Sequence, residues 1–146
     1  MALLKPETAL RYRLVNDADI SAIISARIYP HMPKQGASFP YMVYERNSSQ
    51  YHHKMGATTS TNLVQHSITF MGFGTAEQYS SLATLGIEIR ASIDGFRGSI
   101  AIGGDSINFE MCHCTGEREG VLDPADGAGN PLHFIEQQYE VAYQTA

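Results

Sequence analysis

Apolar residues recur at helical spacing close to the start of the chain. Leu10 and Leu14 lie four residues apart, which places them on one face of a helix. Pro6 presets the backbone angle of a first helical turn, and Glu7 complements the positive end of a helix. Together these signals predict a helix over residues 6–14.

A second, shorter helix is expected directly after the first. Asp17 or Asp19 can cap its start, and it extends to Ala26. Pro30 and Pro33 then prevent the helix from continuing. Its apolar side consists of Ile20, Ile23 and Ile24.

The strongest helical pattern spans residues 76–93. Thr75 and Gln78 have the spacing of a capping box at its start, and Asp94-Gly95 provides a stop. The predicted core stripe comprises Tyr79, Leu82, Leu85, Gly86, Ile89 and Ile93. Ala76, Ala83 and Ile87 widen that stripe beyond the roughly 100° that one packed face needs. A second neighbour, such as another subunit, would cover the extra width, with Ala83, Ile87 and Arg90 as the candidate interface residues.

Strand-like segments separate and follow these helices. The aromatic and β-branched residues of 39–46 predict one strand, and strict alternation predicts another over 62–71, with Val64, His66, Ile68 and Phe70 facing inward. Further strands are expected at 99–102, at 107–112 and at 135–143. In the strand at 107–112, Ile107, Phe109 and Met111 are expected to face opposite to Asn108, Glu110 and Cys112. Because only one long helix separates the strands, the pattern predicts an α+β fold with a mostly antiparallel sheet.

Two polar segments interrupt this pattern. Residues 47–62 contain almost no apolar side chains and predict a long loop or an extended, mobile hairpin arm. Within it, Tyr51, His52, His53, Lys54 and Met55 are candidate partner contacts. Residues 116–131 predict a second long loop, and Gly72 and Gly74 predict a turn.

Length and composition narrow the class of protein. A chain of 146 residues fits a single domain with its own core, here taken as 1–146. With 10 Lys and Arg against 15 Asp and Glu, the formal charge of −5 is opposite to the basic footprint of a nucleic-acid-binding protein. We expect a soluble protein that is not exported and does not bind membranes, because neither a signal peptide nor an apolar span is visible.

The candidate chemistry is sparse. Cys112 and Cys114 are too close in sequence to form the usual zinc-ligand pair, and no second pair of cysteines exists, so the pattern predicts no metal and no other cofactor. His66 on an apolar strand face is expected to be a core histidine with one satisfied nitrogen. The G-x-G at Gly72 lacks the remaining residues of a phosphate-binding loop, and the segment 123–127 favours a turn over a calcium loop. An enzyme is therefore the less favoured hypothesis, and no catalytic residue is assigned.

Four short pieces, in their order and spacing, resemble the tail-completion or tail-terminator proteins of tailed bacteriophages and prophages. They are residues 26–30, 39–44, 93–98 and 138–143, and the resemblance extends from about residue 6 to residue 143. The motif residues are Arg27, Ile28, Tyr29, Pro30, Pro40, Tyr41, Asp94, Gly95, Phe96 and Arg97. Their types indicate structural roles at helix ends, strand starts and chain reversals.

The resemblance implies a small α+β subunit of the virion that forms a ring, commonly of six copies, at the head-proximal end of the tail tube. Such a ring, assembled in the host cytoplasm, ends tube polymerisation and joins the tail-tube protein to the head connector, while DNA passes through as cargo. Residues such as Asp105, Glu110, Asp123, Asp126, Glu136 and Glu140 could give it an acidic inner wall, although the acidic excess could equally serve solubility.

Two other classes stay open on the sequence alone. One is a small cytoplasmic α+β hydrolase that uses His66 or His113, and the other is a ligand-binding domain. Formation of a discrete ring favours the terminator, whereas a persistent monomer with a deep polar pocket favours the alternatives.

Overall fold

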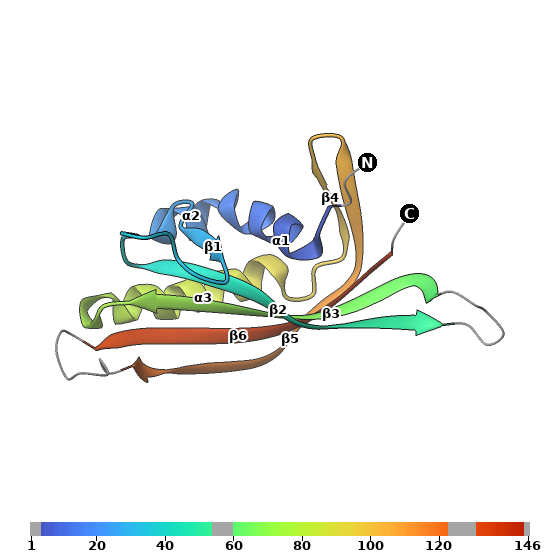
Figure 1. Cartoon of the computed structure of the whole chain (residues 1–146). Helices are drawn as coiled ribbons and strands as arrows, with labels where there is room; N and C mark the ends of the chain where they lie inside the picture. Colours follow the sequence, from blue (N-terminus) through green and yellow to red (C-terminus); the bar gives the residue numbers. More distant parts are fainter. Residues whose placement is uncertain (1–3, 54–59, 123–130, 145–146) are drawn as a thin grey trace.

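A computed structural model describes residues 4–53, 60–122 and 131–144. Its sheet has six strands in the order β1-β2-β3-β6-β5-β4, and three helices lie over one of its faces (Figure 1). The strands are β1 (Ile28–Pro30), β2 (Tyr41–His53), β3 (Ser60–Gly74), β4 (Gly98–Ile102), β5 (Asp105–Leu122) and β6 (Leu132–Gln144). Only β1 and β2 pair in parallel, so the predicted α+β fold with a mostly antiparallel sheet is confirmed.

The three helices occupy the predicted segments. They are α1 (Pro6–Val15), α2 (Ala18–Ile24) and α3 (Tyr79–Ile93). Asp17 is the residue that caps α2, because its carboxylate accepts hydrogen bonds from the N–H groups of Asp19 and Ile20 at 3.0 and 3.3 Å. None of these helices in the described part of the chain is long and apolar enough to cross a membrane.

The start of α3 differs slightly from the prediction. Residues Ala76–Gln78 form a 3-10 turn, and the α-helix begins at Tyr79. The Gln78 side chain accepts a hydrogen bond from the Thr75 N–H at 3.0 Å, as the predicted capping box requires. Tyr79 is predicted to lie in the core, but 49% of it is exposed, because it is the first residue of α3 and lies beside His133 at the start of β6.

Both polar segments are in part β-strand, which confirms the hairpin-arm alternative for the first and corrects the predicted loop for the second. Residues 47–53 continue β2, and residues 116–122 continue β5, because their backbone groups complete ladders with β3 and β6 whatever side chains they carry. Of the two alternatives for residues 47–62, the hairpin arm is therefore the correct one over the described strands. In Figure 1 this arm extends beyond the helical layer. Residues 54–59 and 123–130 lie outside the described residues.

Gly72 and Gly74 do not form a turn, because both belong to β3. A Cβ at Gly72 would lie 3.2 Å from Ile135 and 3.3 Å from Leu85. The missing side chain lets α3 approach the sheet closely, so packing against the helix is the physical reason for this glycine.

The core lies between the helices and the covered sheet face. Its largest fully buried side chains are Tyr139, Phe70, Phe109, Leu10, Leu14, Ile20, Ile24, Ile28, Met42, Ile68, Leu85 and Ile93. A β-bulge between Phe109 and Met111 shifts the alternation of β5 by one residue. As a result Cys112 is buried and Met111 is only half-buried, which corrects the predicted facing of this strand.

Candidate functional site

The outward side of α3 presents the candidate interface residues. Ile87 is 61% exposed, and Ala83 one turn earlier is half-buried. Ala91 one turn later is also exposed, so the three residues form a stripe at four-residue spacing, which we call the α3 stripe. Arg90 lies beside this stripe, and its guanidinium forms an ion pair of 3.1 Å with Glu117 of β5.

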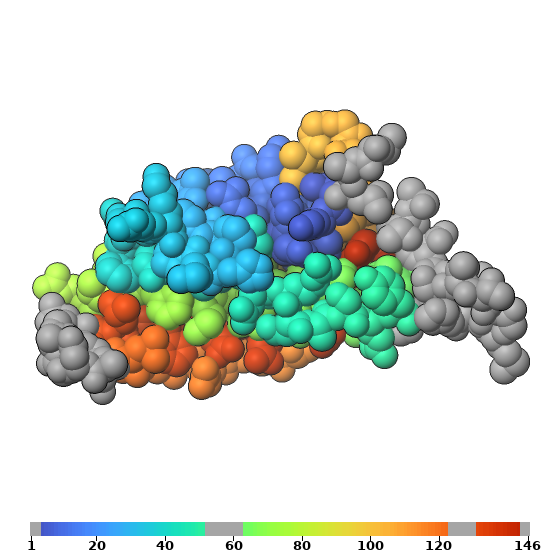
Figure 2. Space-filling model, in the orientation of Figure 1, coloured from blue at the N-terminus to red at the C-terminus, as the bar shows by residue number. Residues whose placement is uncertain are grey.

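The predicted partner contacts lie on the β2 side of the hairpin arm or beyond it. Tyr51 is 57% exposed in β2. His52 and His53 end the strand, and Lys54 and Met55 lie outside the described residues. Figure 2 shows β2 along the front of the molecule below the helices, so this strand offers an accessible edge.

Arg27 joins the end of α2 to the sheet. Its Nε donates to the carbonyl of Pro40 at 2.8 Å, and its own carbonyl accepts from the Met42 N–H at 2.8 Å. Ile28 is buried in β1, and its carbonyl accepts a hydrogen bond from Arg11 Nε at 2.8 Å. These bonds place β1 against the start of β2.

An aromatic cluster lies at the start of β2, on the sheet face that the helices leave uncovered, which we call the helix-free face. The Tyr41 ring is stacked on Phe39 at 5.1 Å, lies edge-on to Tyr29 at 6.3 Å and contacts Phe73 at 5.6 Å. Phe73 is paired in register with Phe134 of β6. The motif residues Tyr29 and Tyr41 therefore belong to a surface cluster and not to the core beneath the helices.

The segment after α3 closes the helix onto β5. The Asp94 carboxylate accepts from the Cys114 N–H at 2.9 Å, and the Gly95 N–H donates to the carbonyl of Cys112 at 2.7 Å. Gly95 has a φ of +80°, a conformation that suits glycine after a helix. Phe96 then packs against the core side of β5, and the exposed Arg97 pairs with Glu110 at 3.3 Å.

His66 is buried, as predicted, but both of its ring nitrogens have partners. Its Nδ1 lies 2.7 Å from the Ser49 hydroxyl, and its Nε2 lies 2.9 Å from the Tyr143 hydroxyl and 3.5 Å from an Arg46 nitrogen. The sequence interpretation of one satisfied nitrogen missed a partner because these residues come from three different strands.

The Ser49–His66 pair has the residue types of a nucleophile and its base. In a catalytic triad a carboxylate on the second nitrogen stabilises the imidazolium. Here that position is occupied by Tyr143 and Arg46. Burial, followed by the charge of Arg46, lowers the pKa of His66, so the site disfavours the charged form that a general base must adopt. The geometry is that of a structural histidine.

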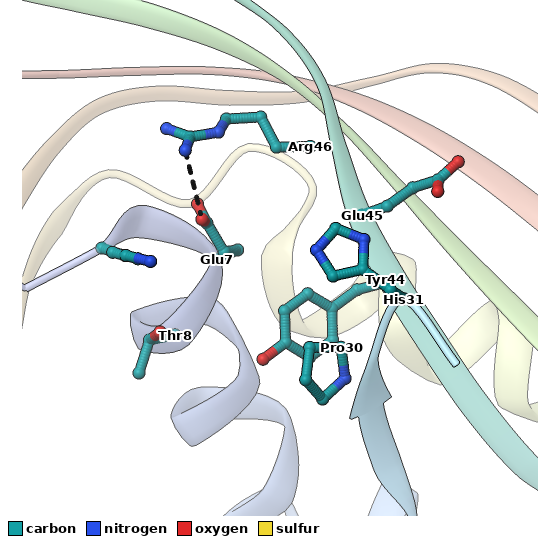
Figure 3. Close-up of a pocket in the computed structure, with 8 residues that line it drawn as sticks. Glu7, Thr8, Pro30, His31, Tyr44, Glu45 and Arg46 are labelled. Atoms are coloured by element: carbon teal, nitrogen blue, oxygen red, sulfur yellow. Dashed lines mark ion pairs between the residues drawn. The ribbon is translucent and has the colours of Figure 1, made fainter. Parts of the chain in front are cut away.

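A pocket of about 370 Å³ lies between the first turn of α1 and strands β1 and β2 (Figure 3). Glu7 and Arg46 form a long ion pair across it, at 3.9 Å, and His31 and Tyr44 line another wall. Basic and acidic groups are mixed in its lining, so its charge selects neither an anion nor a cation.

The two cysteines are unlike each other. Cys112 is fully buried, and burial raises the pKa of its thiol to about 12. Cys114 is half-buried on the same side of β5, and His113 is exposed on the other. In the part of the chain that the structure describes, no three His, Cys, Asp or Glu side chains gather where they could hold a metal ion.

The helix-free face of the sheet carries acidic residues on its central strand. Glu136 is paired with Arg118 at 2.7 Å, and Glu140 accepts a hydrogen bond from Gln65 at 3.0 Å. Of the other acidic candidates, Glu110 is engaged by Arg97 and Asp105 begins β5, whereas Asp123 and Asp126 lie outside the described residues.

Comparison with known proteins identifies the fold. No family model matches the chain, and no curated protein matches it. A chain in the solved virion of a native gene transfer agent particle is similar in structure, with a TM-score of 0.66 at 10% identity over 96% of this chain and 95% of that one. A second solved structure, which carries no functional name, has a TM-score of 0.54 at 13% identity over 98% and 99% of the two chains. At these identities the likeness establishes a shared fold.

Proposed function

We propose that this protein is a structural component of a phage-like virion, and more specifically a tail terminator. In this role it forms a homo-oligomeric ring, with six copies as the expected number, at the head-proximal end of the tail tube. The ring ends tube polymerisation and joins the tail-tube protein to the head connector. It acts by binding alone, without a catalytic residue or cofactor.

The observation that carries the proposal is the fold shared, end to end, with a virion chain. The match covers 96% of this chain and 95% of that one, so it involves nearly the whole length of both chains and not one common motif. The tail-terminator role itself rests on the resemblance of the motif residues around Arg27, Pro40 and Asp94.

The surface of the subunit suits a closed ring. A ring of identical copies needs two different, complementary surfaces on each subunit. The α3 stripe of Ala83, Ile87 and Ala91 supplies an exposed apolar strip flanked by the Arg90–Glu117 ion pair. The hairpin arm projects away from the helices and supplies a second surface for a neighbouring copy, the tube or the connector.

The charge balance suits a conduit for DNA. Six copies, each with a formal charge of −5, carry −30. An acidic wall repels phosphate groups over about 8 Å at physiological salt, so DNA would pass without being held. Glu136 and Glu140 lie on the helix-free sheet face; Arg118 neutralises Glu136, whereas Glu140 is bonded by the uncharged amide of Gln65 and is the better candidate for such a wall.

The test is assembly of the purified protein, alone and with its tail-tube protein, measured by light scattering and electron microscopy. Ile87→Glu places a charge on the α3 stripe and should abolish the ring while leaving the monomer folded. Gln35→Glu adds the same charge at an exposed position outside α3, and as the matched control it should assemble normally. A protein that stays monomeric with and without tail tubes would refute the proposed function.

A further inference from the structure

Strand β4 forms one edge of the six-stranded sheet. It pairs with β5 through the register Gly98↔Phe109 to Ile102↔Asp105, and among the described residues no strand pairs with its other side. A two-residue turn, Gly103-Gly104, joins the two strands. In an antiparallel ladder hydrogen-bonded pairs alternate with non-bonded pairs, and the pair that flanks such a turn is bonded. The backbone groups of Ser99 and Ala101 therefore point away from β5, toward the free edge.

This edge lacks the usual protection against strand pairing. Natural edge strands carry charges, prolines or bulges that block the approach of another strand. The segment Gly98–Ile102 has the sequence GSIAI, with no charge and no proline, and its pairing with β5 is regular. An unprotected edge in a native protein implies that something covers it.

A groove follows this edge. Its volume is about 500 Å³, and its walls are Ser99 to Ala101 of β4 and Ala91 and Ser92 of α3. The end of α1 forms the remaining wall and contributes Tyr12 and Asn16 together with one basic and one acidic residue, Arg13 and Asp17. Ala91 is also the last residue of the α3 stripe. The free edge and the proposed subunit interface are thus parts of one continuous surface.

The opposite side of the sheet carries the complementary edge. Strand β1 pairs only with residues Met42, Val43 and Tyr44 of β2. From Glu45 onward, no described strand pairs with that side of β2. Asn47 is a bulge, because the register with β3 shifts between Arg46 and Ser48. The regular, exposed and uncharged part of this edge is therefore residues 48–51, with the sequence SSQY, which end in the aromatic ring of Tyr51.

We propose that β4 of one subunit pairs with residues 48–51 of β2 in a second copy, so that the sheet continues from subunit to subunit. The two edges belong to opposite ends of one sheet, which makes the contact head-to-tail, and a head-to-tail contact closes into a ring or extends as a filament. Both edges are uncharged, so their approach meets no repulsion, and Tyr51 can enter the groove beside Ala91. This inference rests on the proposed function and specifies which surfaces close the ring.

Ala101 provides the sharpest test. Ala101→Pro removes an N–H that faces the free edge and is not needed by β5, so the monomer should keep its circular dichroism spectrum. The ring should be lost, and the protein concentration needed for oligomer formation should rise at least tenfold. Ala101→Val keeps the N–H and the strand preference, and as the matched control it should assemble like the original protein. A ring formed normally by Ala101→Pro would overturn the inference.

Cross-linking provides a test that does not depend on the folding of the proline variant. In a Cys114→Ser background, a subunit with Ala101→Cys is mixed with one carrying Ser48→Cys or Gln50→Cys and oxidised. Ser48 and Gln50 are paired with Ser67 and Gln65, on the helix-free face to which Ala101 also belongs. Mixed disulfide dimers are expected with at least one of the two, and their absence with both would contradict the proposal.

Two further outcomes separate the inference from the proposed function. Disulfide dimers of Ala101→Cys alone would mean that β4 pairs with β4 of a twofold-related copy, and the head-to-tail proposal would be wrong. If the unmodified protein forms its ring but neither cross-link appears, the strand pairing fails and the terminator proposal stands. If no ring forms at all, the terminator proposal fails first.

Discussion

Gln137 forms a buried polar bridge between the sheet and α3. It is 1% exposed, and its amide nitrogen donates to the carbonyl of Gly86 at 2.8 Å. Its amide oxygen accepts from the hydroxyl of the fully buried Tyr139 at 2.7 Å. Residue Gly86 allows this contact, because a Cβ there would come within 3.3 Å of the Gln137 amide and much closer to Ile135.

Gln137→Met replaces the amide with an apolar group of similar size. The Gly86 carbonyl keeps its place in the helical ladder, but the Tyr139 hydroxyl loses its acceptor. Leaving a buried donor unsatisfied costs about 1–3 kcal/mol, and we expect the free energy of unfolding to fall by that amount. For a domain of this size each kcal/mol lowers the midpoint temperature by about 2–4 °C.

A double-mutant cycle isolates the bridge. Tyr139→Phe alone removes the donor and should cost about 1 kcal/mol, whereas the double variant removes both partners and leaves neither unsatisfied. The two single costs should therefore exceed the cost of the double variant by at least about 1 kcal/mol. The assay is urea denaturation followed by circular dichroism at one fixed protein concentration, because assembly would shift the midpoint.

Gln138→Met is the matched control, since Gln138 is the exposed neighbour on the opposite face of β6. We expect it to change the stability by less than about 0.5 kcal/mol. Additive effects of Gln137→Met and Tyr139→Phe, within about 0.5 kcal/mol, would refute the coupled bridge. A cost of Gln137→Met no greater than that of the control would refute its structural importance altogether.

Three other outcomes follow from the same structure. The pKa of His66 is lowered in the folded protein, so the unfolded chain binds a proton at this residue first, and the free energy of unfolding should fall as the pH drops below about 6.5. His66→Gln should flatten this pH dependence, whereas His113→Gln should leave it unchanged. Equal slopes in the original protein and both variants would contradict the prediction. Iodoacetamide at pH 8 should modify Cys114 long before Cys112, because Cys112 is fully buried and its thiol pKa of about 12 leaves almost no thiolate; mass spectrometry tests this. Cys112→Ser should also cost more stability in urea denaturation than Cys114→Ser, because Cys114 is only half-buried. The assembled ring should not retard linear duplex DNA in a low-salt gel-shift titration, and micromolar binding that weakens steeply with salt would disprove the repulsive wall.

Local patterns were sufficient to predict most of the elements. The spacing of Leu10 and Leu14, the cap at Asp17 and the stop at Asp94-Gly95 all act within a few residues, so they can be recognised without the fold. The same holds for the inward face of β3, where strict alternation places Ile68 and Phe70 in the core.

The errors arose where a distant partner overrides the local pattern. The polar residues of 47–53 and 116–122 lack a strand-like composition, but neighbouring strands satisfy their backbone groups and hold them in the sheet. The bulge after Phe109 depends on pairing with β6, and it buries Cys112 against the expected alternation.

The sequence by itself determined the helices, the central strands and the α+β class, because caps, turns and apolar periodicity are short-range properties. Only the tertiary structure decided which edges of the sheet stay free, which nitrogens of His66 are satisfied and how Gln137 joins α3 to the sheet. Each of these depends on contacts between residues far apart in the chain. Such contacts cannot be predicted from the spacing of residues in the sequence, because the order of strands in the sheet differs from their order in the chain.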